Sequence, residues 1–404
     1  MNHRIALLAA AHLGAWSVLA AQNVMISDVP DYSWYAGCWG TASGNIMGYW
    51  DRHGLPDFYT GPTGDGVAPL NSVGSNQSIR SMWASKAGVD GRPVDQPGHI
   101  DDYFTNGDEN SYESTAPDPY KSLGRAEHSP DCLGDFMGAS QNKWGDLDGE
   151  CSGNIDAFAF NYWDHSGHRR VNFTPPPSGG IPGRDVQSGI RTWAKYRGYD
   201  AEVSSQLADF NPEVQPGNGF TFEDLKAEID NGYPVLLMLQ NPGELFRNLP
   251  GMPRGNPEIH AMLAYGYVTT DDGQQIVRYR TSWGSGDNMY SIWGPDVWQA
   301  GMTLRGVLLF HPAPKITKTE VVEGGLKISW DGPSSTLIDN TAGASFPTHW
   351  YGLEKEDDLN GEFTPAADPV SDLEITVSVP YPARNVFFRV KVMTPEQAGK
   401  PRGQ

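Results

Sequence analysis

Cysteine is scarce in this chain of 404 residues, which contains only three. Basic residues are also few: 29 Lys and Arg stand against 49 Asp and Glu and leave a formal net charge of −20 at pH 7. Nucleic acids and anionic membranes repel such a surface, so we expect neither as a partner. Beyond the N-terminus, no apolar run approaches the roughly 20 residues of a membrane-spanning helix.

Several catalytic signatures are missing as well. The chain has no HExxH, P-loop, G-x-S-x-G or GxGxxG motif, which argues against a metalloprotease, a nucleotide enzyme or a serine hydrolase. His165 and His168 have i, i+3 spacing, yet two ligands do not make a zinc site, and we expect a structural role for them. We therefore expect neither a metal nor another cofactor.

The first 21 residues are typical of a secretory signal peptide. Arg4 supplies a positive charge, residues 5–19 form an apolar core, and small residues near Ala21 form a cleavage site. A retained anchor helix is the alternative, but the run is shorter than the ~20 apolar residues that a span requires. We expect a secreted monomer, extracellular or periplasmic, that begins at residue 22.

An acidic stretch with two cysteines marks the middle of the chain. Residues 101–164 hold 14 Asp and Glu against three Lys and Arg, which we interpret as a solvated surface. In an oxidising compartment, a disulfide between Cys132 and Cys151 would leave Cys38 free, whereas pairing with Cys38 is the alternative. Weak calcium binding is a less favoured interpretation of four acidic residues, because Cys151 holds the required glycine position: Asp146, Asp148, Glu150 and Asp156.

Cys38 stands at the predicted start of an amphipathic helix. Apolar residues follow with helical spacing as far as Trp50, and Gly54 and Pro56 end the pattern. Glycine recurs every four residues over residues 40–48, which implies a closely packed partner, because each glycine costs about 1 kcal/mol in a helix interior. The unpaired N–H groups of a first helical turn favour a thiolate and can stabilise an oxyanion. A buried structural cysteine is the alternative.

A thiolate nucleophile needs a base, and His260 has the most suitable surroundings of the ten histidines. It begins an apolar run at residues 261–268, followed by an Asp-Asp-Gly turn at residues 271–273 and a second strand at residues 275–282. This pattern predicts a β-hairpin that brings His260 close to Thr281. A satisfied core histidine is the alternative interpretation.

Together, these residues resemble a known family. The chain resembles papain-fold cysteine peptidases of the bacteriocin-leader-processing (double-glycine peptidase-like) type and their free-standing secreted relatives. Three features carry the resemblance: Cys38 begins a helix of small residues, the segment DVPDYSWYAGC leads into it, and His260 lies on a strand before TSWG. Residues 188–203 and 221–240 resemble helix-and-strand pairs of the same layout. The resemblance covers roughly residues 24–312, apart from an insert at about residues 55–184.

The resemblance implies an α+β papain-like fold, in which an N-terminal helix carrying the cysteine packs on an antiparallel sheet carrying the histidine. It also implies Cys38 as nucleophile, His260 as general base, and Thr281 as the group that orients the imidazole where the family has Asn or Asp. The chain departs from the family at Gly40, where Pro is usual, and no Gln precedes the cysteine. Oxyanion-hole or cleft roles fall to three aromatic residues: Tyr35, Trp39 and Trp283.

The C-terminal part of the chain has a different pattern. After Pro312, alternating apolar residues predict five strands, at residues 315–322, 325–331, 349–356, 373–379 and 385–393. Together they predict a small all-β sandwich, which resembles fibronectin type III-like modules of secreted bacterial enzymes. We expect three regions after the signal peptide: a peptidase domain at 22–312, this sandwich at 313–396, and a polar tail at 397–404.

The expected function is that of a secreted thiol protease, a cysteine-type peptidase that hydrolyses peptide bonds in a peptide or protein substrate. The alternative is a catalytically weak or inactive relative that acts in peptide binding or surface adhesion. Thr281 favours the alternative, because a hydroxyl fixes an imidazolium less strongly than a carboxylate does. The free thiol of Cys38 and the position of His260 favour the enzyme.

Overall fold

The computed structural model describes residues 21–32, 37–58, 67–72, 130, 133–137, 163–177, 183–240, 259–282, 289–296, 298, 302–356, 362–378 and 386–400. The body of the predicted signal peptide lies outside these residues. Cys132 and Cys151, proposed as a disulfide, also lie outside them, as do the four acidic residues of the calcium-like loop. Those assignments stay predictions.

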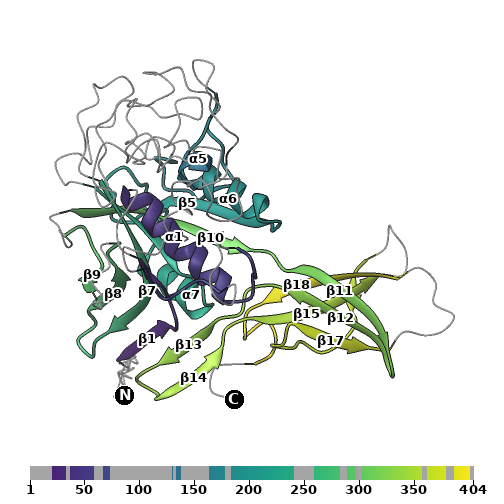
Figure 1. Cartoon of the computed structure of the whole chain (residues 1–404). Helices are drawn as coiled ribbons and strands as arrows, with labels where there is room; N and C mark the ends of the chain where they lie inside the picture. The colour runs from purple at the N-terminus through teal and green to yellow at the C-terminus, as the bar shows by residue number, and fades with distance from the viewer. Residues whose placement is uncertain are drawn as a thin grey trace, which may run out of the picture.

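A ten-stranded sheet forms the main body of the described structure (Figure 1). Eight strands follow the order β14-β13-β1-β7-β6-β10-β5-β4, and β8 and β9 extend the sheet from β7. Neighbouring strands in it run antiparallel. The strands are β1 (Gln22–Ile26), β4 (Arg170–Val171), β5 (Ala201–Leu207), β6 (Val235–Gln240), β7 (Ile259–Thr269), β8 (Gln275–Arg280), β9 (Met289–Ile292), β10 (Thr303–Pro312), β13 (Thr336–Asp339) and β14 (Ala344–Pro347).

The central strands are buried because both faces of the sheet are covered. β6, with the sequence VLLMLQ, is buried along its whole length, and β10 is buried at nearly every position. The predicted hairpin at residues 261–282 is confirmed as β7 and β8. A short parallel pair, β2 (Asp31–Tyr32) with β3 (Asn71–Ser72), forms a separate two-stranded sheet.

The helices pack against this sheet or against one another. They are α1 (Gly37–Arg52), α5 (Leu133–Met137), α6 (Val186–Tyr196) and α7 (Phe222–Asp230), with α1 and α7 on β7 and α6 on β5. The helix predicted from Cys38 is confirmed as α1, and Gly48 leaves room on it for the hydroxyl of Tyr32. Capping boxes at Asp185 and Thr221 begin α6 and α7. In the described part of the chain, no helix is long and apolar enough to cross a membrane.

The five predicted C-terminal strands are confirmed as β11 (Lys315–Val322), β12 (Gly325–Asp331), β15 (Trp350–Glu356), β17 (Glu374–Val377) and β18 (Phe387–Met393). With β16 (Thr364–Pro365) they form two three-stranded sheets, β11-β12-β17 and β16-β15-β18. Trp330, Tyr351 and Leu353 lie at the centre of a separate apolar cluster between them. The hairpin of β13 and β14 was not predicted, and it pairs with β1 at the edge of the main sheet.

The predicted papain-like α+β fold is wrong. Among the residues that the structure describes, the protein is mostly β: strand residues account for 42% and helical residues for 16%, and the strands assemble into large antiparallel sheets. The difference between the predicted and the observed fold has a physical cause. Local motifs around Cys38 and His260 dominated the prediction, whereas the architecture is set by pairings between distant segments, such as β1 with β7 and with β13.

Candidate functional site

His260 lies near the start of β7, opposite Leu239 of β6, and is only 2% exposed. Its Nε2 lies 2.6 Å from the main-chain carbonyl oxygen of Thr281. A carbonyl oxygen only accepts hydrogen bonds, so Nε2 carries the proton and donates it to this bond. In the neutral ring, Nδ1 therefore holds the lone pair of a base.

Burial keeps this imidazole neutral. Loss of solvation is the largest effect and lowers the pKa of His260 to about 4, whereas the hydrogen bond to the Thr281 carbonyl acts in the opposite direction. At neutral pH the ring is consequently a proton acceptor at Nδ1. When it takes up a proton, the same carbonyl stabilises the positive charge through Nε2.

Thr281 contacts the imidazole in a way that its residue type did not reveal. The sequence suggested that the hydroxyl would orient the ring, but the atom bonded to His260 is the carbonyl oxygen of the main chain. Every residue carries such a carbonyl, so this contact does not depend on a threonine. What matters is the backbone conformation that turns the carbonyl toward the ring.

Ser282 supplies that conformation and was given no role by the sequence. It is completely buried and has a φ of 68°, in the left-handed region that residues other than glycine seldom adopt. Its Oγ donates a hydrogen bond of 2.9 Å to the carbonyl of Ala261. Two hydrogen bonds thus join the two strands: the His260 side chain donates to the Thr281 carbonyl, and the Ser282 side chain donates to the Ala261 carbonyl. They continue the β7–β8 pairing past its last backbone pair, Leu263 with Arg280.

Helix α1 lies against β7, the strand that carries His260. Near the C-terminus of the helix, Tyr49 Oη donates to the carbonyl of Gly232, 3.1 Å away and just before β6, and α1 packs against β7. At about 1.5 Å per residue, Cys38 lies about 16 Å from Tyr49 along the helix. Cys38 therefore lies at the opposite end of α1 from the contact with Gly232.

Of the other predicted site residues, the structure describes the side chain of Trp39 alone. Cys38 is the second residue of α1, and its side chain lies outside the described residues. Trp39 is fully buried in the apolar core, so it anchors the first turn of α1 and does not line an open cleft. Tyr35 and Trp283 lie outside the described residues, and their predicted oxyanion or cleft roles stay predictions.

The paired histidines near residue 165 have partners on the protein. His165 Nδ1 pairs with a carboxylate oxygen of Glu213, and His168 Nδ1 lies 2.7 Å from the hydroxyl of Ser166. Within the described segments, no group of three His, Cys, Asp or Glu side chains could hold a metal ion.

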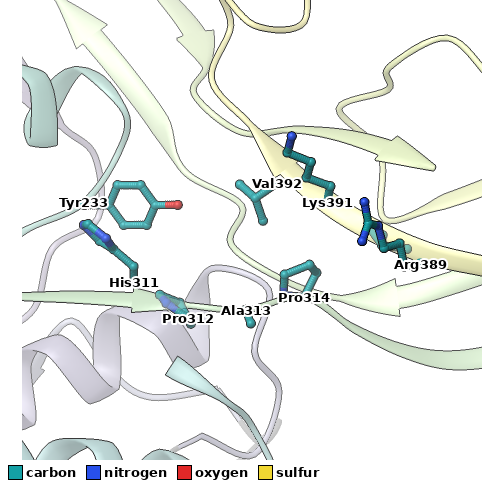
Figure 2. A pocket seen from close by; sticks show the side chains of 9 residues that line it. Tyr233, His311, Pro312, Ala313, Pro314, Arg389, Lys391 and Val392 are labelled. Atoms are coloured by element: carbon teal, nitrogen blue, oxygen red, sulfur yellow. The ribbon is translucent and has the colours of Figure 1, made fainter. Parts of the chain in front are cut away.

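A pocket of about 510 Å³ lies at the junction of β10 and β18 (Figure 2). Tyr233 and His311 line one side of it and face Val392 on the other. His311 Nε2 lies 2.6 Å from a carboxylate oxygen of Glu228. The β10–β6 register places His311 beyond the start of β6, whereas His260 pairs near the end of β6. The two histidines therefore belong to opposite ends of the sheet.

Comparison with models of protein families found no match. Comparison with curated proteins found no match either. The resemblance to cysteine peptidases rests on the motif residues of this chain.

Proposed function

We propose that the protein is a secreted cysteine-type peptidase, in which Cys38 is the nucleophile and His260 the general base. One observation carries the proposal: a buried neutral imidazole, fixed through Nε2 by the Thr281 carbonyl, lies on β7, the strand against which the helix that begins with Gly37 and Cys38 packs. A base with a defined tautomer beside a helix N-terminus that carries a thiol is the arrangement that nucleophilic acyl transfer requires.

The reaction follows from the groups present. Nδ1 of His260 takes the proton of the Cys38 thiol as sulfur attacks the scissile carbonyl carbon, and the carbonyl oxygen becomes an oxyanion. Unpaired N–H groups in the first turn of α1 stabilise that negative charge. The imidazolium then passes its proton to the leaving amine, and the C–N bond breaks to give a thioester. Water, deprotonated by the same Nδ1, hydrolyses the thioester and restores the thiol.

The resting pair is neutral in this mechanism. Because the pKa of His260 is about 4, a resting thiolate–imidazolium ion pair is disfavoured at neutral pH, and proton transfer accompanies attack. The reaction uses only protein side chains and water, so the proposal includes no cofactor. Its substrate is a peptide or an unfolded protein segment.

The proposal is tested by incubating the chain and its Cys38→Ala variant with an unfolded, fluorescein-labelled protein, and following the release of labelled peptides. We expect hydrolysis by the unaltered chain and none above background by the variant. Mass spectrometry of an acid-quenched reaction should show an acyl group on Cys38. Equal hydrolysis by both proteins, or an acyl group on another residue, would overturn the assignment. A folded chain that cleaves nothing would leave peptide binding without turnover as the function.

A further inference from the structure

Arg278, on β8, is a buried cation with no acidic partner. It is only 7% exposed, and within the described residues no carboxylate lies within ion-pair distance of it. Its guanidinium donates instead to two neutral groups, the thioether of Met25 and the hydroxyl of Tyr290, and its Nε finds no hydrogen-bond partner in the described structure. A thioether is a weak acceptor, and an uncompensated buried charge is costly. The molecule therefore retains this cation at the expense of stability.

The sheet explains how the guanidinium comes to lie there. Met25, Gly266, Arg278 and Tyr290 form one row across β1, β7, β8 and β9. Gly266 has no side chain, and a Cβ at this position would lie 2.7 Å from the carbonyl oxygen of Val24. The Arg278 side chain crosses this bare strip to reach Met25, so it lies along the surface of the sheet.

A groove of about 840 Å³ is lined by Met25 and Arg278 of this row, and its volume is within the usual size of a ligand site. Arg280 forms part of it, held by Asp31 at 3.9 Å and by the ring of Tyr265 at 4.7 Å. Amide side chains also line it, beside apolar ones. The less polar part of its wall is formed by Met25, Leu70, Tyr265 and Ile338.

We propose that this groove binds a carboxylate attached to an apolar group, with Arg278 as its counter-charge. A guanidinium fork matches the two oxygens of a carboxylate, and Met25 with its apolar neighbours accommodates the body of the ligand. Asp31 pairs with Arg280, whereas no described carboxylate lies within ion-pair distance of Arg278, so Arg278 is the guanidinium left to pair with the ligand. A doubly charged phosphate would be repelled by Asp28 and Asp31, which also line the groove. The carboxylate belongs either to the C-terminus of a peptide or to a free organic acid. This site does not rest on the proposed peptidase function.

Calorimetric titration of the full chain carrying Cys38→Ala tests the site without turnover of the probes. The probes are the tripeptide acetyl-Gly-Gly-Phe with a free or an amidated C-terminus, phenylacetate with phenylacetamide, and inorganic phosphate. We expect at least one acid to bind about tenfold or more tightly than its amide, and phosphate to bind more weakly than that acid. Binding of the tripeptide acid alone identifies a chain terminus as the ligand, whereas equal binding of phenylacetate shows that a free acid suffices.

Two variants make the test specific to Arg278. Arg278→Met should bind the acid about tenfold more weakly or worse, whereas Arg389→Gln, an exposed arginine on β18, should bind it unchanged. Independently of any variant, the preferred acid should raise Tm by about 1–2 °C at ten times its Kd and the amide should not. Acid and amide that bind alike, unchanged binding by Arg278→Met, or no acid-dependent rise in Tm would each refute the site.

Discussion

Replacing His260 with Ala is expected to lower kcat/KM for peptide hydrolysis by about three orders of magnitude, because Cys38 then loses its general base. The thiol would have to react through the small fraction that ionises unaided near its ordinary pKa of about 8.5. The loss should fall mainly on kcat, since the imidazole acts in proton transfer and does not hold the substrate.

His311→Ala is the matched control for this variant. His311 lies on the same sheet, near the opposite end from His260, and bonds to the Glu228 carboxylate. We expect its kcat/KM to stay within about threefold of that of the unaltered chain, because it takes no part in the proposed proton transfer. A His260→Ala variant that is folded and as active as His311→Ala would eliminate His260 as the base.

Variants at residues 281 and 282 separate the carbonyl contact from the side chains. Thr281→Ala keeps the carbonyl that holds the imidazole, so its activity should change by no more than about threefold. Ser282→Ala removes the bond to the Ala261 carbonyl and leaves a nonglycine residue at a φ of 68°, so a drop of about tenfold or more in kcat is expected. A large loss in Thr281→Ala would show that its side chain is the orienting group, as the sequence first suggested.

His349→Phe is expected to make the protein more resistant to acid. His349 is buried against Tyr233 and Trp50, and its Nε2 has no hydrogen-bond partner in the described structure. Burial, followed by repulsion from His311 and His53, lowers its pKa from 6.5 to about 3. Phenylalanine fills a similar volume, removes the unpaired nitrogen, and cannot take up a proton.

The direction follows from proton uptake. In the unfolded chain His349 binds a proton below about pH 6.5, whereas in the folded chain it stays neutral down to about pH 3. Between these values the unfolded state binds more protons, so stability falls as the pH falls, by about 1.4 kcal/mol per pH unit for this group. The contribution of neutral His349 to the free energy of unfolding is therefore fully present above pH 6.5, and about 3 kcal/mol of that free energy is lost by pH 4.5. His260 adds a loss of the same sign in this window.

Urea denaturation at pH 7.5 and at pH 4.5 measures this effect. At pH 7.5 the free energy of unfolding of the His349→Phe variant should lie within about 1 kcal/mol of that of the unaltered chain. At pH 4.5 it should be higher than that of the unaltered chain by about 3 kcal/mol. His168→Phe, at an exposed position, should follow the unaltered chain at both values. Equal sensitivity to acid in His349→Phe and in the unaltered chain would contradict the burial of a neutral His349.

The local elements of the fold could be predicted from the sequence, but its architecture could not. Alternation in LKISW, with turns on either side, predicted β12 with its observed bounds, and the neighbouring segment KITKTEVV was predicted as a strand with the bounds of β11. The β13–β14 hairpin was missed because its strands are short and its stability comes from pairing with β1, roughly 310 residues earlier. Such non-local pairings carry no local signal, and they are what makes the protein mostly β.

The candidate site was predictable to a similar degree. A thiol at a helix start and a histidine at a strand start have recognisable patterns, and they led to Cys38 and His260. The Thr281 carbonyl left no signal, since a main-chain acceptor is present at every position. Arg278 was also invisible: arginine alternating with apolar residues in QIVRYR indicates a solvent-facing side, and the residues that cover it, such as Met25, are far away in the sequence.

Alkylation of Cys38 by iodoacetamide between pH 5 and pH 9, followed by mass spectrometry, tests the proposed Cys38–His260 pair most directly. At pH 6 we predict that the thiol reacts at least about tenfold faster in the unaltered chain than in His260→Ala, because neutral Nδ1 accepts its proton. In His311→Ala the rate should equal that of the unaltered chain. Equal rates with and without His260, both rising with an apparent pKa near 8.5 as in a free cysteine, would contradict the pair and leave Cys38 an ordinary thiol.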